Sequence, residues 1–155
     1  MKRRNLLSGG VIALLALGSL PRMAAADNIP YEVVVEWNHI PYDQDAAATQ
    51  AYEDGKVYKK VLMQGAKVDS KGNIYVSTAR WGGPEVPATL SKVVVKDGKK
   101  MLQAYPSAEM NKVGDGHAFQ AVLGFEIDRN DVLWILDQGH VAGAPSIPGA
   151  EKLVL

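Results

Sequence analysis

The sequence lacks cysteine, so neither a disulfide framework nor a thiolate metal site can form in this chain. It also lacks an excess of charge of one sign, with 17 Lys and Arg against 17 Asp and Glu. No Gly-rich phosphate loop, Gly-x-Ser-x-Gly elbow, EF-hand loop or closely spaced pair of histidines is present. These absences argue against the common nucleotide-binding, serine-hydrolase and metal-binding motifs. We therefore predict no metal and no bound cofactor.

The first 26 residues differ in charge from the rest of the chain. They contain no acid and four bases, Lys2, Arg3, Arg4 and Arg22, which leaves 13 bases against 17 acids over residues 27–155. A mildly acidic body offers no basic surface to a nucleic acid. We therefore expect no nucleic-acid partner.

Residues 1–26 have the layout of a secretory signal peptide. A basic start is followed by an apolar stretch of about 15 residues, shorter than the ~20 of a permanent membrane helix. Small residues then predict cleavage between Ala26 and Asp27. This predicts a secreted or periplasmic protein with no stable membrane span after cleavage; the alternative is an uncleaved anchor. Arg3-Arg4 also resembles the twin-arginine export signal, so the export route stays open.

Short apolar runs separated by 15 Gly and eight Pro favour β-structure with many turns. Residues 31–37 are rich in β-branched and aromatic residues and predict an N-terminal strand. Asp45 before an alanine-rich run predicts a short N-capped helix near 44–53, ended by Gly55. Further strands are predicted over residues 61–68, 74–78, 91–95, 100–104, 121–127, 132–136 and 151–155.

An internal repeat relates residues 68–76 to residues 127–135. In both copies an apolar residue and an aspartate end a strand, a polar turn follows, and an apolar–aromatic–apolar run begins the next strand. The aspartate side chain can accept hydrogen bonds from the N–H groups of the turn. The repeat predicts blades of a β-propeller; the alternative is two unrelated hairpins in a β-sandwich.

Four segments, taken in order, resemble the major royal jelly protein/Yellow family. They are Arg80-Trp81 with Val86-Pro87-Ala88-Thr89-Leu90, then Tyr105-Pro106-Ser107 before Asn111, then Phe119 to Asp128 with Leu133-Trp134-Ile135-Leu136-Asp137-Gln138-Gly139, and Ala150 to Leu155. The resemblance covers the chain from about Tyr52 onward. Animal members of the family carry cysteines. This chain has none, and in that respect it resembles the cysteine-free bacterial branch of the family.

The resemblance implies an all-β fold, a six-bladed β-propeller. Family chains are more than twice as long as this one, so residues 27–155 are expected to be the N-terminal part of such a propeller. That part would hold about two blades plus the N-terminal strand, and the chain would be a fragment or a truncated gene product. Two blades alone leave sheet edges and apolar faces exposed, which predicts self-association.

The resemblance also implies a small-molecule ligand at the central channel. Insect relatives are linked to pigment formation and to the binding of biogenic amines. The first hypothesis is therefore an exported, non-catalytic binding protein. The alternative is a propeller enzyme, either a calcium-dependent lactonase or one similar to a dopachrome isomerase, for which the sequence assigns no catalytic residue.

Five residues are candidates for contact with that ligand. Arg80 and Trp81 follow a strand, where they could stack on a ligand; alternatively Trp81 is buried and Arg80 pairs with an acid. Asp137, Gln138 and His140 follow the last strand of the second repeat. Asp137 could bind a ligand amine there, or it could only cap the turn, and His140 could be merely solvated.

Overall fold

A computed structural model describes residues 31–155, of which residues 35–155 form one compact unit. The predicted signal peptide, with its cleavage between Ala26 and Asp27, lies outside the described residues and stays a prediction. None of the helices found in residues 31–155 combines the length and the apolar character that crossing a membrane requires.

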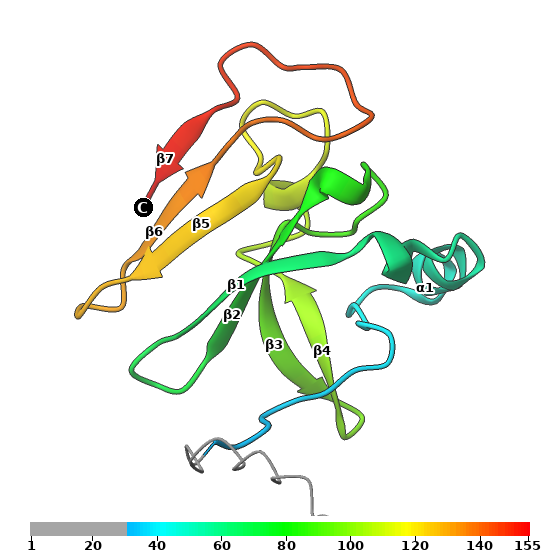
Figure 1. Cartoon of the computed structure of the whole chain (residues 1–155), viewed down its shortest axis with the longest axis vertical. Coiled ribbons are helices and arrows are strands. Elements are labelled where there is room, and N and C mark those ends of the chain that lie inside the picture. The colour runs from blue at the N-terminus through cyan, green and yellow to red at the C-terminus, as the bar shows by residue number, and fades with distance from the viewer. Residues whose placement is uncertain (1–30) are drawn as a thin grey trace, which may run out of the picture. The chain divides into compact units, whose positions relative to one another are not determined.

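The unit contains two antiparallel sheets in which strands consecutive in the chain pair with each other (Figure 1). The first sheet has the order β1 (Leu62–Val68), β2 (Ile74–Ala79), β3 (Leu90–Lys96) and β4 (Lys99–Ala104). The second has the order β5 (Val122–Ile127), β6 (Leu133–Asp137) and β7 (Lys152–Val154). The fold class is the predicted one, all-β and consistent with part of a propeller; within residues 31–155 the sheets do not close into a ring.

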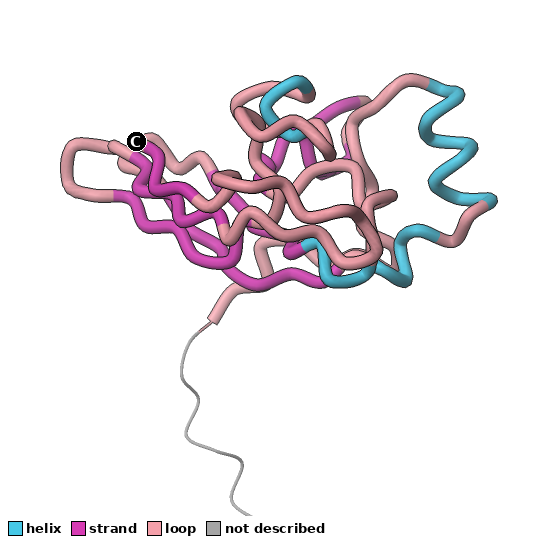
Figure 2. Tube along the Cα trace, turned by 90° about the horizontal axis from the view of Figure 1, so that it is seen from above, coloured by secondary structure: helices cyan, strands magenta, loops and turns pink. Residues whose placement is uncertain are grey.

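The predicted helix is α1 (Ala46–Asp54), and it lies at the end of the unit opposite to the C-terminus (Figures 1 and 2). Asp45 is its N-cap and accepts a hydrogen bond from the Ala48 N–H at 2.7 Å. Gly55 ends it by donating its N–H to the Ala51 oxygen. Three short 3₁₀ segments complete the elements, η1 (Val57–Lys60), η2 (Arg80–Gly82) and η3 (Glu109–Asn111).

The strand predicted over residues 31–37 is absent, and this prediction was wrong. β-Branched residues favour an extended backbone, but a strand also needs a neighbour to complete its hydrogen bonds. The edge of β4 is instead taken by residues 41–43: Leu102 donates to the Pro41 oxygen, and Asp43 donates to the Leu102 oxygen. Trp37 adds a hydrogen bond from Nε1 to the Lys100 oxygen at 2.8 Å.

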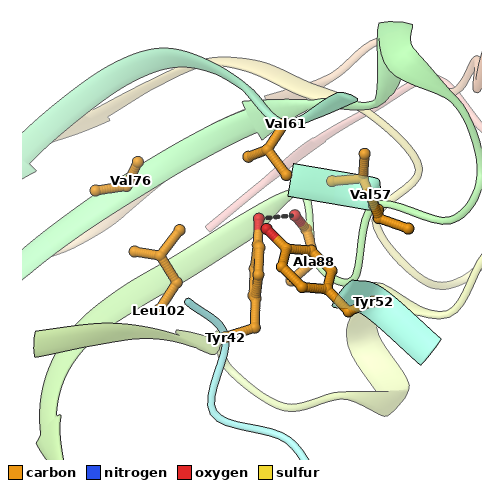
Figure 3. Packing of buried hydrophobic residues seen from close by; sticks show 8 residues of the cluster. Tyr42, Tyr52, Val57, Val61, Val76, Ala88 and Leu102 are labelled. Atoms are coloured by element: carbon orange, nitrogen blue, oxygen red, sulfur yellow. Dashed lines mark hydrogen bonds between the residues drawn. The ribbon is translucent and has the colours of Figure 1, made fainter. Parts of the chain in front are cut away.

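One face of the first sheet is covered by α1 and the segment that precedes it (Figure 3). Its buried members are Tyr42, Tyr52, Val57, Val61, Val76, Val86, Ala88 and Leu102. Tyr42 lies within this cluster, and Figure 3 marks the hydrogen bond from its hydroxyl to the Ala88 oxygen, which measures 3.4 Å. The same hydroxyl lies 3.1 Å from Thr78 Oγ1. Burial raises the pKa of Tyr42 to about 12, so the hydroxyl stays a neutral donor.

The opposite face of the first sheet packs against the second sheet, with β5 beside β1 and β2. The buried residues between the sheets are Tyr75, Leu90, Phe119, Val122, Phe125 and Ile135. Neighbours along β2 alternate, since Tyr75 belongs to this cluster and Val76 to the one beneath α1. Each such side chain contributes roughly 1.5–3 kcal/mol by leaving water, so both faces of the first sheet stabilise the unit.

The repeat seen in the sequence is also a repeat of hydrogen bonds. Asp69 accepts from the N–H groups two and four residues later, at 3.0 and 2.8 Å, and Asp128 does the same at 2.8 and 3.1 Å. The aromatic residue six positions on also donates to the same carboxylate, from Tyr75 Oη at 3.3 Å and from Trp134 Nε1 at 3.2 Å. Such equivalence favours the repeat over two unrelated hairpins.

The repeat extends further than the sequence alignment indicates. The pairing of β1 with β2 shifts between Met63 and Gly65, and the pairing of β5 with β6 shifts between Val122 and Gly124. Both residues of the second pair lie 59 positions after those of the first. A β-bulge with glycine at one end therefore stands at the same place in each repeat.

Candidate functional site

The loops that follow β2 and β6 lie against each other. The Ala142 N–H donates to the main-chain oxygen of Arg80 at 3.1 Å, which ties the loop after β6 to η2. All five candidate residues belong to these two loops or to the strand end that precedes one of them. The structure thus brings together two segments that are almost 60 residues apart in the sequence.

Arg80 is 1% exposed and lies at the centre of this region. Its five N–H groups all donate to main-chain oxygens at 2.5–3.2 Å, those of Val86, Pro87, Asn111, Phe119 and Gln120. Among residues 31–155 no acid forms an ion pair with it. The acid partner considered in the sequence analysis is therefore absent, and no guanidinium N–H is left for a ligand.

Burial lowers the pKa of Arg80 to about 10, which still leaves the guanidinium charged at neutral pH. The charge is balanced by carbonyl dipoles from three segments, the loop before β3, η3 and the entry to β5. Because one rigid planar group joins all three, Arg80 fixes the loops of the first sheet to the start of the second.

Asp137 is 1% exposed and acts as the turn cap that the sequence analysis gave as its alternative role. Its oxygens accept the N–H groups of Gln120, Ala121 and Gly139 at 2.8, 2.8 and 3.0 Å. Lys152 Nζ of β7 lies 3.1 Å away as a counter-ion. The carboxylate therefore holds β5, β6 and β7 together, and it is surrounded by donors from this chain.

Two further buried side chains complete the network, and sequence reasoning assigned neither of them a role. Asn111 accepts the N–H groups of Thr89 and Leu90, at the start of β3, at 2.9 and 3.1 Å and donates to two carbonyls of the preceding loop. Gln120 accepts the Gly114 N–H and donates to three carbonyls of the loop 112–118. The N–H groups that Asn111 accepts lie 22 and 21 residues before it, so no local pattern identifies its role, whereas the side-chain partners of Gln120 lie within eight residues. The one signal in the sequence was that Asn111 belongs to a segment, with Tyr105-Pro106-Ser107, that resembles the family.

The remaining three candidates lie at the surface of the same loops. Trp81 is 49% exposed, which contradicts the alternative of a buried indole. Gln138 is partly buried, and its side-chain amide donates to the His140 oxygen at 3.3 Å. His140 is exposed. An indole and an imidazole thus face solvent above a frame whose polar groups are hydrogen-bonded.

An open groove of about 520 Å³ begins at Arg80. Its lining includes the apolar side chains of Pro84, Val86, Pro87 and Val113. The carboxylates of Glu85 and Glu109 belong to the same lining, and Glu85 pairs with Lys60 at 3.2 Å. In the part of the chain that the structure describes, no three His, Asp or Glu side chains gather as metal ligands would.

Comparisons with known proteins found relatives but no matching family model. Major royal jelly protein 7 of Apis mellifera is 28% identical over 141 residues, covering 84% of this chain and 30% of that protein. Major royal jelly protein 5 is 28% identical over 137 residues, with 85% and 22% covered. Major royal jelly protein 1 is 30% identical over 118 residues, with 70% and 26% covered. The chain spans less than a third of the length of these curated relatives.

Proposed function

Because the chain belongs to the major royal jelly protein/Yellow family, we propose that it supplies part of a small-molecule binding site in an exported β-propeller protein. The ligand class that fits the described residues is an organic amine with an aromatic ring. The proposed role of the chain is to bind this ligand. Export would depend on residues 1–26, which have the sequence of a signal peptide.

One observation carries this proposal. The loops after β2 and β6 are held together by a buried network, and their exposed side chains project from it. Arg80 and Asp137 use their polar atoms within the chain, so they fix the loops in place. A recognition surface needs such preorganised support, since a mobile loop loses affinity when it becomes ordered.

The chemistry of the surface favours a cation attached to a ring. Trp81 offers an exposed indole face, which attracts cations and stacks with aromatic groups. Glu85 and Glu109 line the groove that begins at Arg80, but Lys112 lines it too and Lys60 pairs with Glu85, so the groove itself has no excess of acid. Residues 27–155 as a whole carry more acids than bases. An excess of negative charge raises the local concentration of cationic ligands.

The proposal is tested by titrating dopamine, as a probe amine, into the chain by isothermal titration calorimetry. Cation–π contacts contribute about 0.5–2 kcal/mol, so Trp81→Ala is expected to weaken binding roughly 2- to 30-fold. Trp81→Phe keeps a ring and serves as the matched control. Equal affinity of the alanine variant and the original chain would contradict the role of Trp81. Absence of saturable binding up to millimolar dopamine would contradict amine binding by this chain.

A further inference from the structure

The groove that begins at Arg80 is a different surface from the one around Trp81. Its first wall is formed by residues 84–87, in the loop between η2 and β3, and its second wall by η3 and the residues on either side of it. Trp81 is not among the residues that line it. The groove can therefore hold a ligand of its own, apart from any that contacts the indole.

The buried guanidinium of Arg80 joins the two walls of this groove from below. It donates to the oxygens of Val86 and Pro87 in the first wall, at 3.0 and 3.2 Å. It also donates to the Asn111 oxygen in the second wall at 2.5 Å. Because one planar group fixes both walls, the groove exists before a ligand arrives, and binding loses little entropy by ordering it.

The lining of the groove is largely apolar between its charged groups. Val86 is 1% exposed, and the carbonyls of this region accept the N–H groups of Arg80. A volume of about 520 Å³ lies within the range of small-molecule sites. The apolar part of the lining favours an apolar group of a ligand and consists of Pro84, Val86, Pro87, Ala108 and Val113.

Two side chains of opposite charge stand on the second wall, Glu109 and Lys112. The Lys112 N–H donates to the Glu109 oxygen at 3.1 Å, which closes the 3₁₀ turn of η3. Side chains three residues apart in such a turn emerge on the same side. Both residues are exposed, and within residues 31–155 neither takes part in an ion pair. The wall thus presents a negative and a positive group near each other.

The acid of the first wall differs from Glu109 in this respect. Glu85 is paired with Lys60 at 3.2 Å, so its charge is already balanced by this chain. Hydrogen bonds, first from its own N–H and then from the Ser107 hydroxyl, hold the pKa of Glu109 below its ordinary value. Glu109 is therefore charged at neutral pH and is the carboxylate of the groove that can receive a cation.

We propose that this groove binds a free α-amino acid with an apolar side chain. The ammonium group of the ligand pairs with Glu109, its carboxylate pairs with Lys112, and its side chain lies on the apolar lining. A simple amine or a simple carboxylic acid satisfies only one of the two charges. A residue inside a peptide carries neither charge, so the groove selects the free zwitterion.

The test is an NMR titration of the ¹⁵N-labelled chain with leucine, following the amide resonances of Lys112 and Val113. Even a modest free energy per non-hydrogen atom gives leucine a Kd of about 10 mM or lower. Two analogues of the same shape each lack one charge: 3-methylbutylamine has no carboxylate and 4-methylpentanoate has no ammonium. Each should bind about 2- to 5-fold more weakly, because exposed ion pairs contribute little. Glycine, which lacks the side chain, should bind at least about fivefold more weakly.

Two variants assign the charges to the two residues. In Lys112→Met, leucine and 3-methylbutylamine should bind equally well, since the group that recognises the carboxylate is gone. In Glu109→Gln, leucine and 4-methylpentanoate should bind equally well for the corresponding reason. Lys59→Met, at an exposed position outside the groove, is the matched control and should keep the full preference for leucine. The same spectra show that each variant is folded.

Three results would overturn the proposal. They are the absence of a saturable shift up to about 100 mM leucine, equal affinity of the original chain for leucine and both analogues, and a preference for leucine that survives in Lys112→Met. Trp81→Ala is expected to leave leucine binding unchanged, because the indole lies outside the groove. Leucine binding and the binding of an aromatic amine can therefore fail independently of each other.

Discussion

The two bulge glycines give a pair of valine substitutions with opposite expected effects on folding stability. Gly65→Val adds a side chain whose methyl groups extend about 1.5 Å beyond Cβ. The Cβ itself would already be 3.6 Å from the Phe125 ring and 3.4 Å from Ser77 Oγ. At least one methyl group would therefore press on the ring or the hydroxyl. Overpacking of this kind costs about 1–3 kcal/mol.

Gly124→Val adds the same atoms at the equivalent place in the second sheet, where nothing lies within 4 Å. Glycine in a strand interior is unfavourable by roughly 0.5–1 kcal/mol relative to alanine, and valine also has a high strand propensity. The free energy of unfolding is therefore expected to stay level or rise by up to about 1 kcal/mol. The free energies of unfolding of the two variants should therefore differ by about 1–4 kcal/mol.

Urea unfolding followed by circular dichroism measures this difference as a shift of the midpoint at constant slope. Gly65→Ala is the matched control, since a single methyl group at 3.4–3.6 Å from its neighbours is an ordinary contact. Equal loss of stability in the two valine variants, or no loss in Gly65→Val, would contradict the close approach of Phe125 to Gly65 and the open space beside Gly124.

The remaining predictions concern the buried network, the turn and the exposed face. Arg80→Lys keeps the charge but leaves several buried carbonyls without a donor, which costs roughly 1–3 kcal/mol for each carbonyl. Thermal unfolding should therefore show that the free energy of unfolding falls by at least about 3 kcal/mol. The control Arg129→Lys, at an exposed position, should show no such fall. Hydrogen bonds, first of all from the Val132 N–H, hold the pKa of Asp128 below its ordinary value of 3.8. The charged Asp128 carboxylate therefore stabilises the fold above that pH, and this stabilisation is lost as the pH falls. The melting temperatures of the original chain and Asp128→Asn should therefore differ at pH 7 and converge below about pH 3.8. We also propose that the chain self-associates through the exposed Trp134, Leu136 and Leu153 of the second sheet; Leu136→Lys should then reduce the sedimenting mass toward that of a monomer.

Each of these results has a counterpart that would contradict it. A mild effect of Arg80→Lys would mean that water or a shifted backbone satisfies the carbonyls. A difference between the two melting temperatures that stays constant down to the lowest pH at which the chain folds would show that the Asp128 charge has no part in the turn. A Leu136→Lys variant that sediments like the original chain would place any self-association elsewhere.

The local elements followed from the sequence because their causes are local. The cap of α1 joins Asp45 to a group three residues away, and each aspartate turn closes within four residues. Alternation of buried and exposed residues likewise needs only the period of a strand. The helix, seven strands and the repeat were therefore predicted to within a few residues of their observed bounds.

The roles of the candidate site residues could not be obtained this way. Arg80 bonds to groups up to 40 residues away, and the Asp137 oxygens meet donors 16 and 17 residues before them. The same residue types in the same pattern would be free to bind a ligand if those partners were elsewhere. The strand wrongly expected over residues 31–37 has the same origin, because a strand exists only where a neighbour completes its hydrogen bonds.

The sequence by itself determined the turns, the helix cap and the order of strands, since each depends on groups a few residues apart. Tertiary structure alone decided which side chains use their polar groups to hydrogen-bond the loops and which side chains remain exposed. It also decided that Phe125 lies against Gly65, whereas the space beside Gly124 is open. Those outcomes depend on contacts between distant segments, and such contacts are set by how the two sheets pack.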